Sequence, residues 1–324
     1  MTPSKSWNEV RIMKKQMANL LAGMVLLAGA MAGFSTVLMA QDDSTRGIVA
    51  EEFVKARPKA GANAAKVPQY KMVGASAKNV SIASIRSSEN TRALGITIWR
   101  LRPALASDGG PRLLEQESGE TIEWTPERVA SDAALRKGDR VRLSIESPRT
   151  GYLYVIDREQ YANKELGEAY LIFPTSRTNN GNNQVTAGKL VDIPAQEDRP
   201  NYFTLKQSRP DQAGEVLTVL VTEKPLEGIT LGPKALALTK EQVADWEKNA
   251  STAVQRYEMT GGAGKTWTKA EQEASQDGTR LLTQDDPGPQ TIYAVSSKGD
   301  EPILVKVGLK YSGSAKAKAT MATK

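Results

Sequence analysis

The feature that most constrains the fold is a series of short alternating segments between residues 137 and 226, separated by turn residues. In segment 140–146 apolar and polar residues alternate, which is the pattern of a strand with one face on a core. The turn at 147–151 leads to a second strand at 152–156, so the two are expected to form an antiparallel hairpin. Segment 216–222 is apolar on both faces and is expected at the centre of a sheet. The whole series predicts a β-sandwich.

The flanking regions continue the β-rich pattern. Residues 95–101 are rich in β-branched and aromatic residues, which suit a half-buried strand, and Pro103 ends this segment. Two closing strands are expected at 291–295 and 302–309, where apolar residues share one face.

Two capping boxes predict short helices in the C-terminal third. Residues 239–242 read Thr-Lys-Glu-Gln, so a helix is expected from residue 239 to 249. Residues 268–271 repeat this pattern, and the short helix that they begin is expected to end near residues 277–278. The expected fold class is therefore mainly β, with one or two short C-terminal helices.

Composition separates these regions from two expected disordered ones. Residues 41–90 contain few large apolar side chains, so they are expected to form a mostly disordered tether. Residues 312–324 alternate Ala and Lys with small residues and are expected to form a basic disordered tail. The remainder is expected to hold a β-sandwich domain at 91–230 and, packed on it, a helical insert with closing strands at 231–311.

The N-terminal forty residues resemble a secretory signal peptide. A basic start is followed by an uncharged, largely apolar run at 16–40, with Leu38 and Ala40 at the −3 and −1 positions before Gln41. The run is also long enough to cross a bilayer, so an uncleaved signal anchor is the alternative. Either way, the body of the protein is expected outside the cytoplasm, in the periplasm or the extracellular space.

Absent residue types exclude several kinds of chemistry. The sequence contains no Cys and no His, which excludes disulfides, thiolate nucleophiles, Cys/His zinc sites and His-based triads. The net charge is +6, and it falls to +3 when residues 1–40 are removed, because 39 basic and 36 acidic residues remain. The two signs are interspersed along the chain, so nucleic acid is not expected as a partner.

The order of landmarks in the central region resembles a known bacterial family. The landmarks are the segments 151–155 (Gly-Tyr-Leu-Tyr-Val), 172–174 (Ile-Phe-Pro), 179–183 (Asn-Asn-Gly-Asn-Asn), 185–188 (Val-Thr-Ala-Gly), 193–194 (Ile-Pro) and 214–226. Over residues 137–226 they resemble the bacterial domain of unknown function 4384. This resemblance implies a small immunoglobulin-like antiparallel β-sandwich that serves as an accessory or sensing module, often beside kinase or caspase-like peptidase domains or in envelope proteins. It carries no catalytic residue over to this chain.

A glycine-rich segment invites a phosphate-loop interpretation. Residues 261–266 read Gly-Gly-Ala-Gly-Lys-Thr, which ends like the motif. Met259 stands where the motif requires Gly, and a helix rather than a strand is expected before it. A flexible linker between two helices is therefore the favoured interpretation.

Three groups of polar residues are candidates for ligand contact. The asparagines form an exposed polar loop or, alternatively, a wide hairpin turn. The tyrosines form an aromatic patch or ordinary cross-strand packing. Two of the carboxylates could act as a pair in glycoside hydrolysis or bind calcium. The sequence favours the alternative, in which they are solvated side chains of a hairpin. The three groups are Asn179, Asn180, Asn182 and Asn183; Tyr152, Tyr154, Tyr161 and Tyr170; and Asp157, Glu159, Glu165 and Glu168.

These observations lead to an exported bacterial envelope protein that acts as a non-catalytic binding or structural module. Asn179, Asn180, Asn182, Asn183 and the tyrosines Tyr152 and Tyr154 are its expected ligand contacts, with no catalytic residue, metal or cofactor. The expected partner is an envelope protein or polymer, and a membrane only through residues 16–40. One alternative is a carboxylate-dependent hydrolase of cell-wall or extracellular polymer. The other is an accessory sensor subunit for a separately encoded kinase or protease.

The signal sequence yields a direct prediction. Expression of the full chain in bacteria should release a protein whose first residue is Gln41, because the small Ala40 fits the cleavage pocket of signal peptidase. Cell fractionation and N-terminal mass spectrometry measure this. An Ala40→Trp variant should stay uncleaved. Recovery of the intact 35.1 kDa chain from the membrane would support the anchor instead, and recovery from the cytoplasm would contradict both.

Overall fold

The computed structural model describes residues 48–59, 68–73, 91–117, 119–276 and 280–312. The expected signal segment and almost all of the expected basic tail lie outside these ranges, as does the predicted helix end at 277–278. Among the described residues, no helix has both the length and the apolar character needed to span a membrane.

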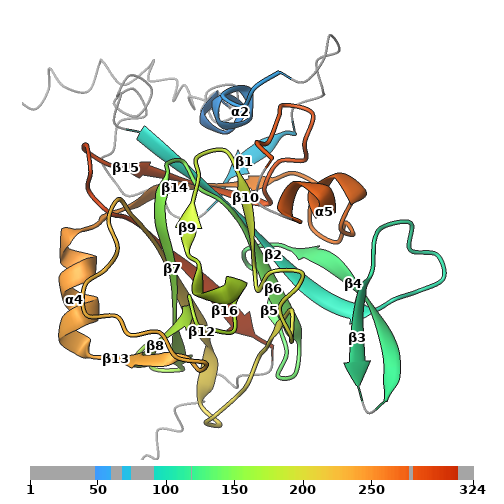
Figure 1. Ribbon diagram of the computed structural model, residues 1–324, viewed down its shortest axis with the longest axis horizontal. Helices are drawn as coiled ribbons and strands as arrows, with labels where there is room; N and C mark the ends of the chain where they lie inside the picture. Colours follow the sequence, from blue (N-terminus) through green and yellow to red (C-terminus); the bar gives the residue numbers. More distant parts are fainter. Residues whose placement is uncertain (1–47, 60–67, 74–90, 118, 277–279, 313–324) are drawn as a thin grey trace, which may run out of the picture. The chain divides into compact units, whose positions relative to one another are not determined.

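Strands dominate the described chain, as predicted (Figure 1). Helices are few and short. The elements are α2 (Ile48–Lys55), β1 (Tyr70–Met72), β2 (Thr91–Pro103), β3 (Leu113–Glu117), β4 (Glu120–Val129), β5 (Ala134–Leu135), β6 (Arg140–Glu146), β7 (Gly151–Tyr161), β8 (Leu166–Phe173), a 3₁₀ turn (Asn179–Gly181), β9 (Gln184–Val185), β10 (Leu190–Ile193), β11 (Phe203–Thr204), β12 (Gln212–Thr222), β13 (Leu236–Leu238), α4 (Lys240–Asn249), β14 (Ser251–Met259), α5 (Lys269–Ser275), β15 (Thr291–Ser296) and β16 (Ile303–Tyr311).

The strands join into one large mixed sheet with the order β10-β6-β2-β15-β14-β16-β12-β7-β8-β13. Most pairs are antiparallel, whereas β14 and β5 each pair with β16 in parallel. Strand β12 is central, because β16 lies on one side of it and β7 on the other. This confirms the prediction that segment 216–222 lies at a sheet centre.

One apolar core lies between two parts of this sheet. Val141, Leu143 and Ile145 of β6 share it with Val219 of β12 and Val305 of β16, and all five are almost completely buried. The inward apolar rows predicted for 140–146 and 302–309 are therefore confirmed. Burial of such side chains stabilises the fold by roughly 1.5–3 kcal/mol each.

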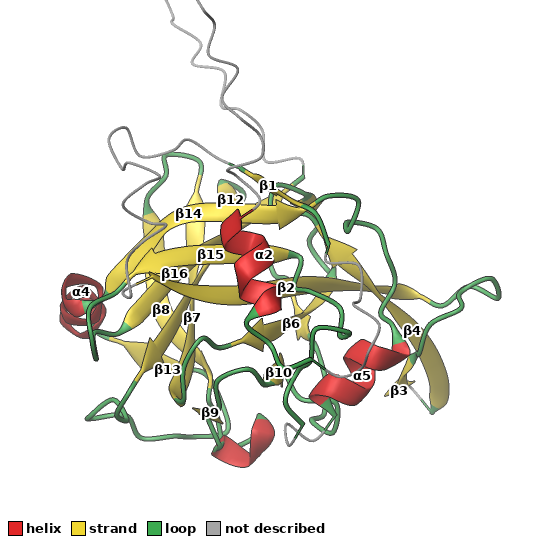
Figure 2. Cartoon of the chain, turned by 90° about the horizontal axis from the view of Figure 1, so that it is seen from above, coloured by secondary structure: helices red, strands yellow, loops and turns green. Residues whose placement is uncertain are grey.

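The outer faces of the strands are covered by helices and loops. Val243 and Trp246 of α4 pack on Tyr154 of β7 and Leu220 of β12. Phe53 of α2 packs on the apolar cluster that contains Ile292 of β15 and Tyr70 of β1. Figure 2 shows α2 lying across β15 and β2. Several strands are thus buried on both faces.

Both predicted helix starts are confirmed. Thr239 caps α4 and Thr268 caps α5, each with the reciprocal hydrogen bonds of a capping box. The hydroxyl of Thr268 accepts from the backbone N–H of Glu271 at 3.2 Å, while the Glu271 carboxylate accepts from the Thr268 N–H at 2.9 Å. These local bonds fix where each helix begins.

The predicted hairpin between segments 140–146 and 152–156 is wrong. Strand β6 pairs with β2, β10 and β11, whereas β7 pairs with β12, β8 and β9. The turn between them crosses from one side of the core to the other. Each of the two strands turns a row of apolar side chains toward this core. Because β6 and β7 lie on opposite sides of the core, the two rows are buried against each other.

The outer face of β6 also differs from the expectation of a solvated polar face. Arg142, Ser144 and Glu146 are 1%, 2% and 3% exposed. Arg142 pairs with Asp192 of β10 at 2.7 Å, and Arg57 covers Glu146. The polar side chains on this face of β6 do not face water. They are buried beneath other segments and are paired with polar groups there.

The region predicted as a tether at 41–90 contains two packed elements, α2 and β1. Val54 is fully buried, and Tyr70 donates a hydrogen bond from its hydroxyl to the Pro289 carbonyl at 2.7 Å. Contacts with residues more than 200 positions away hold these elements in place, so their local composition did not reveal them. Strand β14 was also not expected, and it follows α4 directly.

The described part of residues 231–311 belongs to one compact unit with the other described residues. Within them, β15 pairs with β2 and β16 pairs with β12. The predicted closing strands therefore complete the sheet.

The close approach of β12 to β16 gives a stability prediction. A Cβ at Gly214 would lie 2.1 Å from the Leu309 carbonyl oxygen, whereas a Cβ at Gly308 would meet nothing within 4 Å. Gly214→Ala should lower the free energy of unfolding by roughly 1–3 kcal/mol through overpacking. Gly308→Ala, the control, should be neutral or slightly stabilising. Urea unfolding measures both, and equal values would contradict the predicted clash.

Candidate functional site

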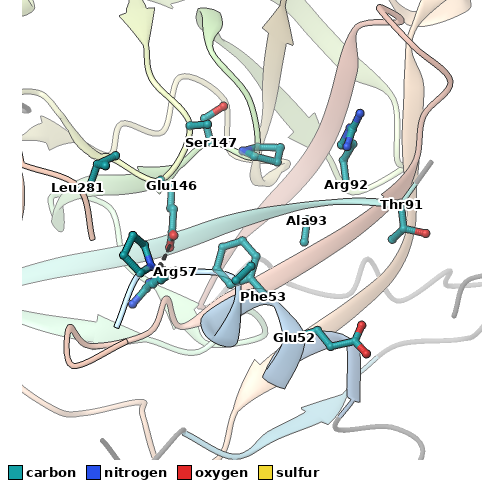
Figure 3. A pocket seen from close by; sticks show the side chains of 14 residues that line it. Glu52, Phe53, Arg57, Thr91, Arg92, Ala93, Glu146, Ser147 and Leu281 are labelled. Atoms are coloured by element: carbon teal, nitrogen blue, oxygen red, sulfur yellow. Dashed lines mark hydrogen bonds and ion pairs between the residues drawn. The ribbon is translucent and has the colours of Figure 1, made fainter. Parts of the chain in front are cut away.

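A pocket of about 560 Å³ lies beside helix α2, and we call it the α2 pocket. The helix and the residues after it form one wall, while the start of β2, the end of β6 and the loop between β9 and β10 form the others. Figure 3 shows the side chains that line it: Glu52, Phe53, Ala56, Arg57, Pro58, Thr91, Arg92, Ala93, Glu146, Ser147, Pro148, Ala187, Gly188 and Leu281.

A buried ion pair forms the floor of the α2 pocket. Arg57 donates to both carboxylate oxygens of Glu146, at 3.0 and 2.6 Å, and the two side chains point toward each other (Figure 3). The Arg57 guanidinium also donates to the Asp286 carbonyl at 2.9 Å. Burial raises the pKa of the Glu146 carboxyl, while Arg57 acts in the opposite direction. This paired floor is polar but has little unsatisfied charge.

The walls of the pocket are largely apolar. The Phe53 ring lies beside the ion pair, and Ala93 and Pro148 continue the apolar surface. Leu281, which is 46% exposed, adds a further apolar side chain to the pocket. Charges of both signs, Glu52 and Arg92, also line the pocket. This arrangement suits a ligand that has an apolar body and carries both charges.

The hydroxyl of Ser147, a residue that lines the pocket, is already hydrogen-bonded within its own turn. It donates to the Arg149 carbonyl at 2.6 Å, which closes the turn between β6 and β7. A serine nucleophile needs an adjacent base that takes its proton. Here a main-chain carbonyl holds that proton, so the geometry favours binding over covalent chemistry at Ser147.

The predicted asparagine contacts lie in the 3₁₀ turn and just after it. Asn179 donates from its side-chain amide to the Asn182 carbonyl at 2.8 Å, and Asn183 donates to the Leu153 carbonyl at 3.0 Å. Asn182 accepts from the Gln184 N–H at 3.0 Å. Asn180 adopts a left-handed conformation with φ of 53°. Much of this amide chemistry therefore shapes the turn, and ligand contact at these residues stays a prediction.

Two of the candidate tyrosines, Tyr152 and Tyr154, pack in the apolar cluster under α4, and ligand contact at them stays a prediction. Tyr154 is 3% exposed, and its hydroxyl accepts from the Leu226 N–H at 2.9 Å. Tyr152 packs at the edge of the same apolar cluster under α4. Tyr161 and Tyr170 donate their hydroxyl protons to Glu159 and Glu168. None of these four tyrosines lines the α2 pocket.

The acidic residues form a cluster that sequence reasoning only partly identified. Glu159 of β7 lies opposite Glu215 of β12, and Asp157 lies two residues away on the same face. Tyr311 of β16 donates to the Glu215 carboxylate. Glu165 is exposed in the turn before β8, and Glu168 is exposed on β8. The three clustered acids share one sheet face, so they do not confront one another across a groove as glycosidase carboxylates do.

Burial changes the acidity of this cluster. Burial, followed by the charge of Glu159, raises the pKa of Asp157 to about 6. Burial, followed by the charge of Asp157, raises the pKa of Glu215 to about 8, although the bond from Tyr311 opposes this rise. Glu215 was missed because it belongs to a strand 56 positions from Glu159. Only the pairing of β7 with β12 brings the acids together.

Neither a metal site nor a phosphate loop is supported in the part of the chain that the structure describes. No group of three or more acidic side chains in these residues is arranged to hold a metal ion. A strand, β14, precedes the segment 261–266, which corrects the expectation of a helix there. Met259 still departs from the phosphate-loop motif, and the next helix begins only at Lys269.

Comparison with known protein families gives a match over part of the chain. The family described as Domain of unknown function (DUF4384) matches residues 134–225, which confirms the resemblance found in the sequence. The match spans β5 to β12 and includes the end of β6 and the loop beside the α2 pocket. No curated protein matches the chain. No solved structure matches it either.

The raised pKa of Glu215 predicts a specific pH dependence of stability. An unfolded Glu titrates near 4.3, so between about pH 4.5 and 8 the unfolded chain loses this proton while the folded chain keeps it. The free energy of unfolding should therefore fall as pH rises through this window, by about 1.4 kcal/mol for each unit of pKa difference.

Glu215→Gln should flatten this decline and make the protein more stable than the wild type at pH 9. Denaturant unfolding at intervals from pH 4 to 9 measures the effect. Glu168→Gln, at an exposed position, serves as the control. Parallel curves for wild type and Glu215→Gln would contradict the prediction.

Proposed function

We propose that this chain is a non-catalytic binding module of the bacterial cell envelope and that the α2 pocket takes its ligand. The observation that carries the proposal is the pocket's composition: an apolar wall, a fully paired ionic floor and a hydroxyl already bonded within its own turn. Such a surface offers shape and polarity to a ligand without an activated nucleophile. Export is supported by the signal-like pattern of residues 1–40.

The ligand that suits the pocket best is a short peptide segment, such as the peptide stem of a cell-wall polymer. Phe53 and Leu281 offer apolar contact to side chains, while Arg92 and Glu52 offer partners for a carboxylate and an ammonium group. The volume of about 560 Å³ lies within the usual range of small-ligand sites.

An immunoglobulin-like sandwich for the matched segment is part of the same proposal. Its strands divide between two sides of the core, with β6, β10 and β11 on one side and β7, β8, β9 and β12 on the other. Leu143 and Val155 represent the two sides in the shared cluster. This division supports a sandwich, and an experimental structure of the segment would test its strand order.

A sedimentation experiment tests the proposed function. The mature protein is mixed with intact peptidoglycan sacculi, with sacculi from which an amidase has removed the peptides, and with outer-membrane vesicles. We expect it to sediment with intact sacculi and to lose this binding when the peptides are absent. Failure to sediment with intact sacculi would contradict the proposal.

Variants connect this binding to the pocket. Ala187 is exposed and lines the pocket, so Ala187→Trp should fill it and weaken binding about tenfold, with an unchanged melting temperature. Ala162→Trp, in an exposed turn away from the pocket, is the matched control and should bind like the wild type. Equal binding by the two variants would assign the ligand to another surface.

A further inference from the structure

A second groove, of about 480 Å³, is lined by four arginines, and we call it the arginine groove. It is separate from the α2 pocket and shares no lining residue with it. Strand β2 contributes Arg100 and Arg102, and strand β4 contributes Trp124. The turn before β6 contributes Arg136, and β6 itself begins with Arg140. Strand β4 pairs with residues 98–103 of β2 and strand β6 with residues 95–101, so the three strands lie side by side (Figure 1).

The arginines of the groove differ in how far they are neutralised. Arg100 and Arg102 share Glu127, at 2.8 and 3.1 Å. Arg136 is exposed, and among the described residues its guanidinium has no ion-pair partner. The one acid that lines the groove, Asp139, accepts the Arg136 backbone N–H at 2.9 Å. The groove therefore retains a free cation at its rim.

Arg140 is held in a stacked position. Its guanidinium carbon lies 4.1 Å from the centre of the Trp124 ring and 4.5 Å from the centre of the Tyr202 ring. Glu117 accepts from Nη2 of Arg140, whereas Nη1 is buried and has no hydrogen-bond partner within the described chain. Stacking of this kind fixes the plane of the guanidinium and so the position of Nη1.

A second donor in the groove also lacks a partner. The indole Nε1 of Trp124 is buried without a hydrogen bond among the described residues, like Nη1 of Arg140. A buried donor without an acceptor costs about 1–3 kcal/mol. An acceptor that enters the groove would offer these two donors the partner that they lack.

From these observations we propose that the arginine groove binds an oxyanion, a carboxylate or phosphate group carried by a small or polymeric ligand. A guanidinium N–H donates to an oxygen of either group, and the stacking of Arg140 holds Nη1, its donor without a partner among the described residues, in a fixed position. Arg136 supplies the charge that attracts the anion, and the indole of Trp124 supplies a further donor. The groove requires no contribution from the α2 pocket.

Titration calorimetry with three probes tests the site and identifies its ligand chemistry. Trigalacturonate carries carboxylates on sugars, tripolyphosphate carries phosphates without sugar, and maltotriose is a neutral sugar of similar size. Binding of either anion, or of both, supports the proposal and shows which oxyanion the groove prefers. Binding of neither anion at millimolar concentration overturns it, and so does equal binding of maltotriose.

Two charge-matched variants locate the binding. Arg136→Gln removes the free cation of the groove and should weaken binding of the preferred anion about tenfold. Lys137→Gln removes the same charge from the next residue, which is exposed and does not line the groove, and should change affinity less than about twofold. Equal losses in the two variants overturn the proposal, because they would indicate attraction by net charge alone. Both positions are exposed, so neither substitution is expected to alter folding.

Discussion

The fold depends on how the outer face of β6 is covered. This strand places apolar side chains on the shared core, so Arg142, Ser144 and Glu146 lie on its opposite face, where they are also buried. A buried charge is costly unless a partner neutralises it. Asp192 does this for Arg142, and Arg57 does it for Glu146. Strand β10 and the segment after α2 are therefore required for β6 to lie where it does.

Much of the secondary structure was predictable because its causes are local. The alternation in β6, β12 and β16 identifies strands, and the capping boxes at Thr239 and Thr268 identify the helix starts. Strand pairing was harder to predict. Alternation every two residues shows which side chains share a face, but it does not show which strand lies beside which. The hairpin error between β6 and β7 has this origin. The same pattern also does not distinguish a solvated polar face from a buried, paired one.

The candidate sites were harder to predict than the strands. The α2 pocket needs Phe53, whose helix lies in a region of low hydrophobicity, to meet Ala93 and Leu281 from distant parts of the chain. The acidic cluster needs Glu215, which reaches Asp157 only through the pairing of β12 with β7. Contacts of this kind depend on topology, whereas the sequence displays only composition and spacing. The family match places the central strands but assigns no chemistry to them.

The bond between Arg57 and Glu146 has a mechanical consequence. It anchors the chain that enters the fold through α2 to the last residue of β6, while β2 and β6 hold each other along seven paired positions. A tension applied ahead of residue 48 would load the contacts of this segment, including the bonds that Arg57 and Gln284 make, before it loaded the backbone ladder of β2 and β6. The wall of the α2 pocket would then detach at a lower force than the sheet, so tension would change the shape of this pocket while the core stays intact.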